Sequence, residues 1–464
     1  MTAADTAEPA EAPDAVGGTD ATDPVAAPDE ADAAAERSLW RNRDFRRFFA
    51  GQFVTNAGDS LYTVAVLWLV FELSGSTVLT GIANAILLLP WLLQILAGPI
   101  VDRLPLRPVL AGSQLLQGVV VLALPLAAAT GNLSVGVIFA VVPLLTLATL
   151  LMAPMQATIV PRIVPDEQLS GANSALATVT LGLDMVFDAL GGGFIALFGA
   201  TTLFLFDAGT FALAALLFAG VAVSRSDDGD GDEGTVDGAD ADDKSILGSY
   251  VADLRDGIDV LRGTVFVELV VTTAVANLAT GVTLAVLPAY GDALGGPAVY
   301  GALLGALGVG RLVGSLLAPY LEHVSYGRLL FVGNAAGAAC WLGAVVAPSP
   351  AITVVLFGLA WVPAGASGVL SSTLNQTVFP TELLGRVSTI KGTASGATLP
   401  LGSLVGGVVA EVLGTATTVG LAAFGFGFTA LYLAVRPQLR RLPPVADADP
   451  AAFGVTVASE PERE

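Results

Sequence analysis

The sequence has very little of what metal sites and catalytic centres are usually built from. Its 464 residues include one cysteine (Cys340), one histidine (His323) and only two lysines (Lys244 and Lys391). A single cysteine excludes a disulfide or a thiolate metal site within the chain. A single histidine excludes a histidine metal cluster, and no Ser–His–Asp or other catalytic arrangement is recognisable. We therefore predict no enzymatic activity, no cofactor and no metal site.

Charged residues are also scarce. They make up 13% of the chain, against about 25% in an ordinary soluble domain, whereas 54% of the residues are hydrophobic. A membrane helix needs roughly 20 apolar residues, so the hydrophobic content supplies about twelve. The apolar runs are continuous and do not alternate, which argues against an outer-membrane barrel. The composition predicts a polytopic α-helical membrane protein.

The net charge of −21 is placed unevenly along the chain. Residues 1–36 hold ten acidic and no basic residues, and a second acidic stretch covers residues 224–262. Such segments are typically solvated and disordered. The scarcity of basic surface disfavours nucleic-acid binding. We expect a disordered acidic tail at 1–44, a helical bundle at 45–223, an acidic linker at 224–262, a second bundle at 263–436 and a disordered tail at 437–464.

Apolar runs between turn residues predict the helices. Six lie before the central acidic stretch and six after it, near 48–72, 78–101, 108–129, 133–156, 172–198, 201–223, 264–289, 298–321, 328–347, 351–375, 387–413 and 417–436. Nineteen of the twenty basic residues fall at alternate loops on one side, and the remaining one, Arg311, lies within a helix. The positive-inside rule makes that side cytoplasmic. Both termini and the linker are then cytoplasmic, in a multi-pass protein of the cell (inner or plasma) membrane.

The two halves resemble each other when the chain is shifted by about 220 residues. Pro99 then aligns with Pro319, and Gly81 aligns with Gly301. The matches are few but they keep one register and fall at the same cytoplasmic loops. Two related six-helix halves are typical of secondary transporters, in which the halves rock around a site near the membrane midplane.

A motif after the second predicted helix extends this interpretation. The stretch GPIVDRLPLR at 98–107 resembles the G-x-x-x-D-R-x-x-R/K loop of the major facilitator superfamily. Four further stretches resemble its macrolide-efflux and enterobactin-exporter branch: IVPRIVPDEQLSGANSA at 159–175, FPTELLGRVSTIKG at 379–392, NAGDSLY in the first helix and FDAGTF in the sixth. The resemblance covers about residues 45–436.

The resemblance implies an all-α membrane protein with the major facilitator fold, in which twelve transmembrane helices form two pseudo-symmetric six-helix bundles. It also implies export of amphiphilic small molecules, drug-like or siderophore-like, by proton or cation antiport. The loop residues Gly98, Asp102, Arg103 and Arg107 would then act as a conformational latch between helix ends. The alternative is that these charges only orient and cap the helices.

Two departures from the superfamily pattern affect the expected mechanism. Helix four has no arginine, and Asp188 in FDALGG (187–192) stands where many antiporters have a proline. Both weaken the expectation of a standard proton-antiport mechanism.

Ionisable residues inside predicted membrane helices are costly and therefore candidates for function. Asp59, Asp184 and Arg311 each lie about 11 residues, or roughly 16 Å, from the cytoplasmic end of their helices. Asp184 and Asp188 share one helix face, where two carboxylates repel each other unless one binds a proton or cation. We expect Arg311 to pair with Asp184 or Asp188 in one conformation, since the superfamily packs helix five against helix eight. A static pair that only holds the fold is the alternative. Asp207 is expected to be structural.

Polar and aromatic residues in the same helices are candidates for the cavity lining. We expect Asn56, Asn84, Asn277 and Trp361 to contribute, although a single asparagine is more often an interhelical hydrogen-bond donor. The glycine-rich stretch at 301–314 lies within a membrane helix, so it is not a phosphate-binding loop. No Walker motif is present.

Transport should therefore depend on an ion gradient, with H⁺ or Na⁺ as the coupling ion, or on the gradient of the substrate itself. The expected partners are a small-molecule substrate and the lipid bilayer, and the fold needs no second subunit. Two other functions stay open: an importer or facilitator of a small metabolite, and a membrane receptor or scaffold that does not transport.

Overall fold

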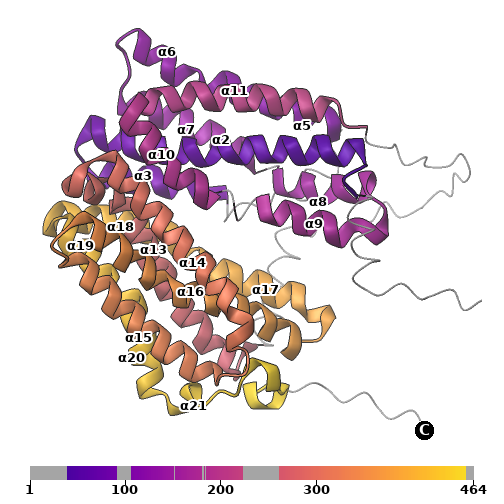
Figure 1. The fold of residues 1–464 in the computed structure, drawn as a ribbon, viewed down its shortest axis with the longest axis vertical. Helices are drawn as coiled ribbons and strands as arrows, with labels where there is room; N and C mark the ends of the chain where they lie inside the picture. The colour runs from indigo at the N-terminus through magenta and orange to yellow at the C-terminus, as the bar shows by residue number, and fades with distance from the viewer. Residues whose placement is uncertain are drawn as a thin grey trace, which may run out of the picture.

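The computed structural model describes residues 39–90, 106–150, 152–179, 182, 184–222 and 261–455. Within these ranges the chain is helical, and the β-structure is limited to an isolated bridge between Ser325 and Pro444. Helices before residue 222 lie together and are called the N-terminal part. Those after residue 261 also lie together and are called the C-terminal part (Figure 1).

The N-terminal part contains nine α-helices among its described residues. They are α2 (Arg43–Ser74), α3 (Thr77–Leu87), α5 (Leu106–Val121), α6 (Ala123–Ala129), α7 (Val135–Thr149), α8 (Met152–Ile163), α9 (Leu169–Thr178), α10 (Asp184–Phe198) and α11 (Ala200–Ala219), with a short 3-10 turn at Asp166–Gln168. Helix α11 packs against α2 and α5 (Figure 1).

The C-terminal part contains a second set of packed helices. Its helices are α13 (Val265–Gly295), α14 (Pro297–Leu321), α15 (Tyr326–Val345), α16 (Pro350–Val378), α17 (Thr381–Gly396), α18 (Thr398–Leu413), α19 (Thr415–Ala422), α20 (Phe424–Val435) and α21 (Pro437–Arg440). Helix α14 packs along α16, and α13 packs along α18.

Ten helices of the described chain are long and apolar enough to cross a membrane. Several of these spans join consecutive helices, such as Val135–Ile163 and Thr415–Val435. Two shorter apolar helices, Thr77–Leu87 and Val186–Phe198, lie where the sequence predicts the second and fifth spans. The described ranges are helical and hold these ten spans, so the prediction of a multi-pass helical membrane protein is confirmed.

Local sequence signals set several helix ends. Asn42 caps α2 by accepting hydrogen bonds from the backbone N–H groups of Asp44 and Phe45, and its own Nδ2 donates to the carbonyl of Ile163 at 2.6 Å. Such caps satisfy amide groups that the first helical turn leaves without partners. At the other end of α2, Gly75 adopts a left-handed conformation with φ of 62°, which glycine accepts without strain.

The C-terminal tail was predicted to be disordered, and this prediction is wrong for residues 437–455. This segment forms α21 and two 3-10 turns, Val445–Asp447 and Pro450–Phe453. Phe453 is fully buried, with its ring centroid 5.9 Å from that of Phe266 in α13. The tail is ordered because apolar side chains on it, Phe453 and Val455 among them, are buried in the core of the C-terminal part, which its composition does not reveal.

The predicted N-terminal tail also ends earlier than expected. Leu39, placed in the disordered tail at 1–44, is 2% exposed and belongs to an apolar cluster with Phe45 and Met155.

At the end of the C-terminal part, Arg436 forms an ion pair with Glu268 of α13. Hydrogen bonding to Glu268 raises the pKa of Arg436 above its ordinary value, so this arginine keeps its positive charge.

Candidate functional site

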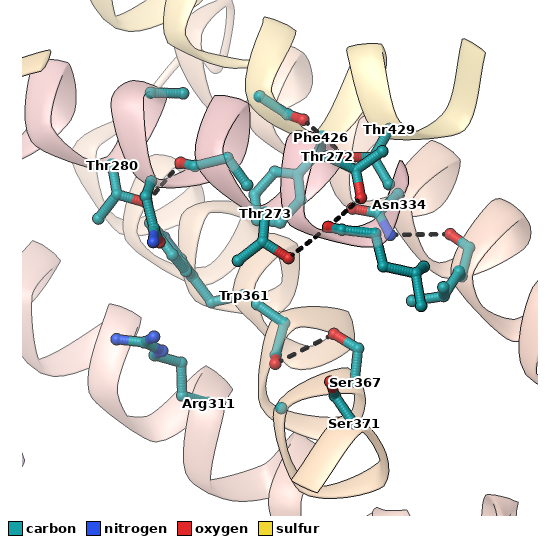
Figure 2. Close-up of a pocket in the computed structure, with 18 of the residues that line it drawn as sticks. Thr272, Thr273, Thr280, Arg311, Asn334, Trp361, Ser367, Ser371, Phe426 and Thr429 are labelled. Atoms are coloured by element: carbon teal, nitrogen blue, oxygen red, sulfur yellow. Dashed lines mark hydrogen bonds between the residues drawn. The ribbon is translucent and has the colours of Figure 1, made fainter. Parts of the chain in front are cut away.

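A cavity of about 280 Å³ lies within the C-terminal part. Figure 2 shows residues that point toward it from several helices, among them Thr272 and Thr273 of α13, Asn334 of α15 and Trp361 of α16. The remaining lining includes Arg311 of α14, Lys391 of α17, and Phe426 and Thr429 of α20. This mixture of aromatic, hydroxyl and cationic groups on converging helices is typical of a small-molecule site.

Aromatic rings form one wall of the cavity. The centroid of Trp361 lies 5.5 Å from those of Trp341 and Phe426. The guanidinium carbon of Arg311 lies 5.6 Å from the centroid of Trp361, a cation–π distance. The rings therefore hold a positive charge at the edge of an apolar surface.

The two tryptophans differ in their hydrogen bonding. Trp341 donates from Nε1 to the carbonyl of Val419 at 2.8 Å. Trp361 is 3% exposed, and its Nε1 is buried without a hydrogen-bond partner among the described residues. Buried polar groups almost always have a partner, so an orphan donor in a cavity wall marks a position for an acceptor on a ligand.

Hydroxyl groups supply the other polar surface of the cavity. The hydroxyls of Thr273, Thr280 and Ser367 donate to carbonyls of their own helices at 2.9, 2.9 and 2.7 Å (Figure 2). These donations leave only oxygen lone pairs directed away from the helix backbone. The hydroxyl surface is therefore suited to ligand groups that donate hydrogen bonds.

The predicted cavity residues fall in three different places. Asn277 and Trp361 line this cavity, and Asn277 donates to the carbonyl of Ser395 at 2.9 Å. Asn56 is half-buried in α2, where it donates to the carbonyl of Gln52. Asn84 is buried between the two parts, where it donates to Ser403 Oγ of α18 at 2.8 Å. The sequence analysis did not select Lys391 or the hydroxyl groups for the cavity. It counted Lys391 with the basic residues of the cytoplasmic side, whereas the structure places Lys391 in α17 as part of the cavity lining.

Two helix pairs join the N-terminal and C-terminal parts by close backbone contact. A Cβ atom added to Gly81 of α3 would lie 2.4 Å from the carbonyl oxygen of Ser403, and one added to Gly301 of α14 would lie 2.6 Å from Cα of Gly192 in α10. Only glycine permits such an approach. Gly81 and Gly301 are the residues that the internal repeat aligns, and each lies at a contact between the parts.

Polar contacts reinforce this junction. Thr77 of α3 donates to the carbonyl of Gly407 at 2.8 Å and lies 3.2 Å from Glu411 Oε2. The rings of Trp68 and Tyr300 stack across the parts with centroids 5.9 Å apart. These residues lie near the helix ends that adjoin the turns at Gly75, Gly296 and Gly414. We call this end of the molecule, where the two parts touch, the joined end.

The cavity lies toward the opposite ends of the same helices. On α14, Arg311 follows Gly301 by ten residues, which corresponds to about 15 Å along a helix. On α13, the lining residues lie between Leu269 and Thr280, before Val282, which packs against Gly406 of α18 toward the joined end. The parts are therefore closed on one side of the cavity.

Of the predicted ion-coupling residues, Asp59 and Asp188 are half-buried in α2 and α10. Asp188 lies close enough to Tyr300 of α14 to act on it electrostatically. Asp184 begins α10, and its side chain lies outside the described residues, as do Gly98, Asp102, Arg103 and the side chain of Arg107. The predicted latch and the pairing of Arg311 with Asp184 stay predictions.

Asp207, expected to be structural, has an unusual environment. It is 0% exposed, and its Oδ1 lies 3.2 Å from the Thr210 hydroxyl. Its Oδ2 is buried without a hydrogen-bond partner in the described chain, and so is the hydroxyl of the neighbouring Tyr62. Gly58 leaves room for this carboxyl, because a Cβ there would lie 2.4 Å from Oδ1. Asp59 and Tyr62 both lie within its electrostatic reach.

Comparison with known proteins shows what this chain is similar to. A family model described as "transmembrane secretion effector" matches residues 36–454. The multidrug efflux pump Tap of Mycolicibacterium fortuitum is 28% identical over 404 residues, which cover 83% of this chain and 94% of that protein.

Among solved structures, the chain resembles the nucleoside transporter NupG (TM-score 0.62, 12% identity, covering 84% of this chain and 98% of that one). It also resembles a D-xylose–proton symporter (TM-score 0.59, 17% identity, covering 87% and 98%). A bacterial homologue of the lysosomal transporter Spinster, in an inward-facing and unoccupied conformation, gives a TM-score of 0.59 at 11% identity, covering 88% and 96%. These likenesses show the fold.

Proposed function

Because the chain belongs to the transmembrane secretion effector family of the major facilitator superfamily, we propose that this membrane transporter exports amphiphilic small molecules across the cell membrane. The observation that carries the proposal is the similarity to a multidrug efflux pump over 83% of this chain and 94% of that protein. A cavity lined by aromatic and polar groups supports it.

The proposed architecture has twelve transmembrane helices in two six-helix bundles. The ten described spans and the two shorter apolar helices support this number. The described basic residues Arg43, Arg162, Arg262, Arg328 and Arg436 all lie at the helix ends opposite the joined end. By the positive-inside rule these ends, and both termini, are cytoplasmic. The structure then corresponds to a state closed toward the outside.

Export requires the two parts to separate at the joined end and to close at the cytoplasmic end. The glycine contacts favour such a two-state junction, since tightly packed backbones are either in contact or apart. The loop residues Gly98, Asp102, Arg103 and Arg107 are proposed to hold the cytoplasmic end when it closes. One polypeptide suffices for this cycle.

Uphill export needs a coupling ion, H⁺ or Na⁺, and we assign its site to carboxyls in the N-terminal part. Asp59 remains a candidate, with Asp184 and Asp188. Asp207 joins them because one of its oxygens is buried without a partner in the described chain. An acidic oxygen of this kind in an apolar interior is a place where a proton or a cation binds.

The test uses everted membrane vesicles energised with a proton gradient. Quenching of a pH-sensitive dye is followed while lipophilic compounds are added to wild type, Asp207→Asn and Asp184→Asn. Proton release on adding a compound, lost in one of the variants, would establish antiport and its carboxyl. Silence with the folded wild-type protein under both a proton and a sodium gradient would contradict export by ion antiport.

A further inference from the structure

The charges that line the cavity of the C-terminal part are of one sign. Arg311 and Lys391 both line it, and none of its lining residues is an aspartate or glutamate. Lys391 lies 4.7 Å above the ring of Phe266 and donates to the amide oxygen of Asn375 at 2.6 Å. The ion pairs seen in the described chain involve neither cation.

Two cations on an apolar wall are expensive in a membrane protein. A basic side chain inside the bilayer costs roughly 2.5–3.5 kcal/mol on insertion scales and is ordinarily paired or hydrated. The rings of Trp361 and Phe266 offset part of this cost through cation–π contact. A full counter-charge is not supplied by the cavity itself, so an anionic ligand would gain from entering it.

The hydrogen-bonding groups near Arg311 point to the same chemistry. Trp361 Nε1 is a buried donor without a partner in the described chain, on the ring that Arg311 covers. Removing water from such a donor costs about 1–3 kcal/mol unless an acceptor replaces it. A carboxylate, sulfonate or phosphate oxygen would accept from this indole and from the guanidinium together.

The rest of the cavity suits an apolar body with few polar groups. Trp341 and Phe426 continue the aromatic wall from Trp361. Threonine and serine hydroxyls on the same lining, among them those of Thr273 and Ser367, present acceptor lone pairs (Figure 2). A lipophilic cation would find no negative charge there and would be repelled by Arg311 and Lys391.

We propose that this cavity selects anionic amphiphiles, with the acidic group of the ligand bound between Arg311 and the indole N–H of Trp361. The proposal rests on the transport function proposed above and names its substrate class. It separates this chain from an exporter of lipophilic cations.

Binding is tested with two dyes that share a xanthene ring, the anion fluorescein and the cation rhodamine 6G. Fluorescence anisotropy of each dye is followed as purified full-length protein in detergent is added at low ionic strength. We expect fluorescein to bind and rhodamine 6G to bind at least tenfold more weakly. Equal or tighter binding of rhodamine 6G, or no binding of fluorescein, would overturn the proposal.

Variants locate the site. Arg311→Gln should weaken fluorescein binding by at least tenfold, and Trp361→Phe should weaken it severalfold while keeping the aromatic wall. The matched control is Arg328→Gln, which removes an exposed positive charge at the start of α15 and should leave binding unchanged. Trp361→Phe removes a donor that has no partner to lose, so it should fold normally.

If Arg311→Gln and Trp361→Phe both bind fluorescein as the wild type does, the proposed site is wrong. Failure of the transport function is distinguishable from this. Fluorescein that binds through Arg311 but is never exported from energised vesicles would contradict export and leave the anion site in place. Export of rhodamine 6G by a protein that does not bind fluorescein would contradict the anion site and leave the export function in place.

Discussion

The hydrogen bond between Asn84 and Ser403 should help to decide which conformation the protein adopts. Both side chains are buried, at 3% and 0% exposure, and they belong to different parts of the chain. Asn84 Nδ2 donates to Ser403 Oγ at 2.8 Å, beside the contact of Gly81 with the Ser403 carbonyl. The bond exists only while the joined end is closed, so its loss weakens the closed state relative to the open one.

The free-energy change caused by Asn84→Ala depends on which hydrogen-bond partners the remaining groups keep. After Asn84→Ala, Ser403 Oγ still lies 3.3 Å from the carbonyl of Gly281 and 3.1 Å from that of Leu399. No buried group is stranded, so the net loss should be that of one ordinary hydrogen bond, about 0.5–1.5 kcal/mol. The ratio of closed to open molecules should fall by about 2- to 13-fold, since RT is about 0.6 kcal/mol.

Spin labels on the two parts at the joined end measure this ratio. Asn132 lies in the exposed turn after α6 and Val346 is 81% exposed after α15. Both positions are changed to cysteine in a Cys340→Ala background, because Cys340 is otherwise the one thiol of the chain. Double electron–electron resonance then gives the populations of short and long distances.

The control removes a similar bond that does not cross the two parts. Asn334 is buried and donates to the carbonyl of Leu330 on its own helix at 2.8 Å. Asn334→Ala should leave the distance populations unchanged. If Asn84→Ala also leaves them unchanged, or increases the closed fraction, the bond does not hold the joined end and the reasoning is refuted.

Three further predictions follow from contacts elsewhere in the chain. Gly301→Leu places side-chain atoms against the backbone of α10, where a Cβ alone would lie 2.8 Å from the Ala189 carbonyl oxygen. The spin labels at positions 132 and 346 should therefore report a longer distance, and a wild-type distance distribution would contradict the close contact. Phe453→Ala should lower the free energy of unfolding by about 3–5 kcal/mol, because this ring is fully buried in the C-terminal core. A denaturation curve in detergent measures this free energy, and the control Phe424→Ala, which truncates a ring that is 58% exposed, should change the free energy far less. Asp207→Asn keeps the shape of the buried carboxyl, but the amide cannot bind and release a proton. Compound-dependent proton release in everted vesicles should therefore fall at least tenfold, while fluorescein binding should be unchanged. Normal proton release would show that Asp207 is not part of the coupling site.

Hydropathy and charge alone were enough to predict the class of this protein. Long apolar runs have few stable solutions in a membrane other than helices, because backbone groups must find partners within the segment. The loop stretch at 98–107 and the exporter-like stretches at 159–175 and 379–392 were enough to predict the family that the comparisons show. These signals are local in sequence, so no tertiary information was needed.

The order of the C-terminal tail was not predictable in the same way. Residues 437–455 have the charged and proline-containing composition of a disordered segment, yet Phe453 is buried against Phe266. Whether this aromatic ring is buried depends on the surfaces of α13 and α16, which are distant from it in sequence. Composition averages over such contacts and therefore misses them.

The partners of individual polar residues were decided only by the tertiary structure. Asn84 and Asn277 looked alike in sequence, but one joins the two parts and the other lines the cavity. Asp207 was expected to be structural and Trp361 to line the cavity, but their buried atoms without a hydrogen-bond partner among the described residues become visible only when the neighbours are placed. Hydropathy indicates which residues lie inside the membrane, whereas helix rotation and pairing determine what each of them contacts.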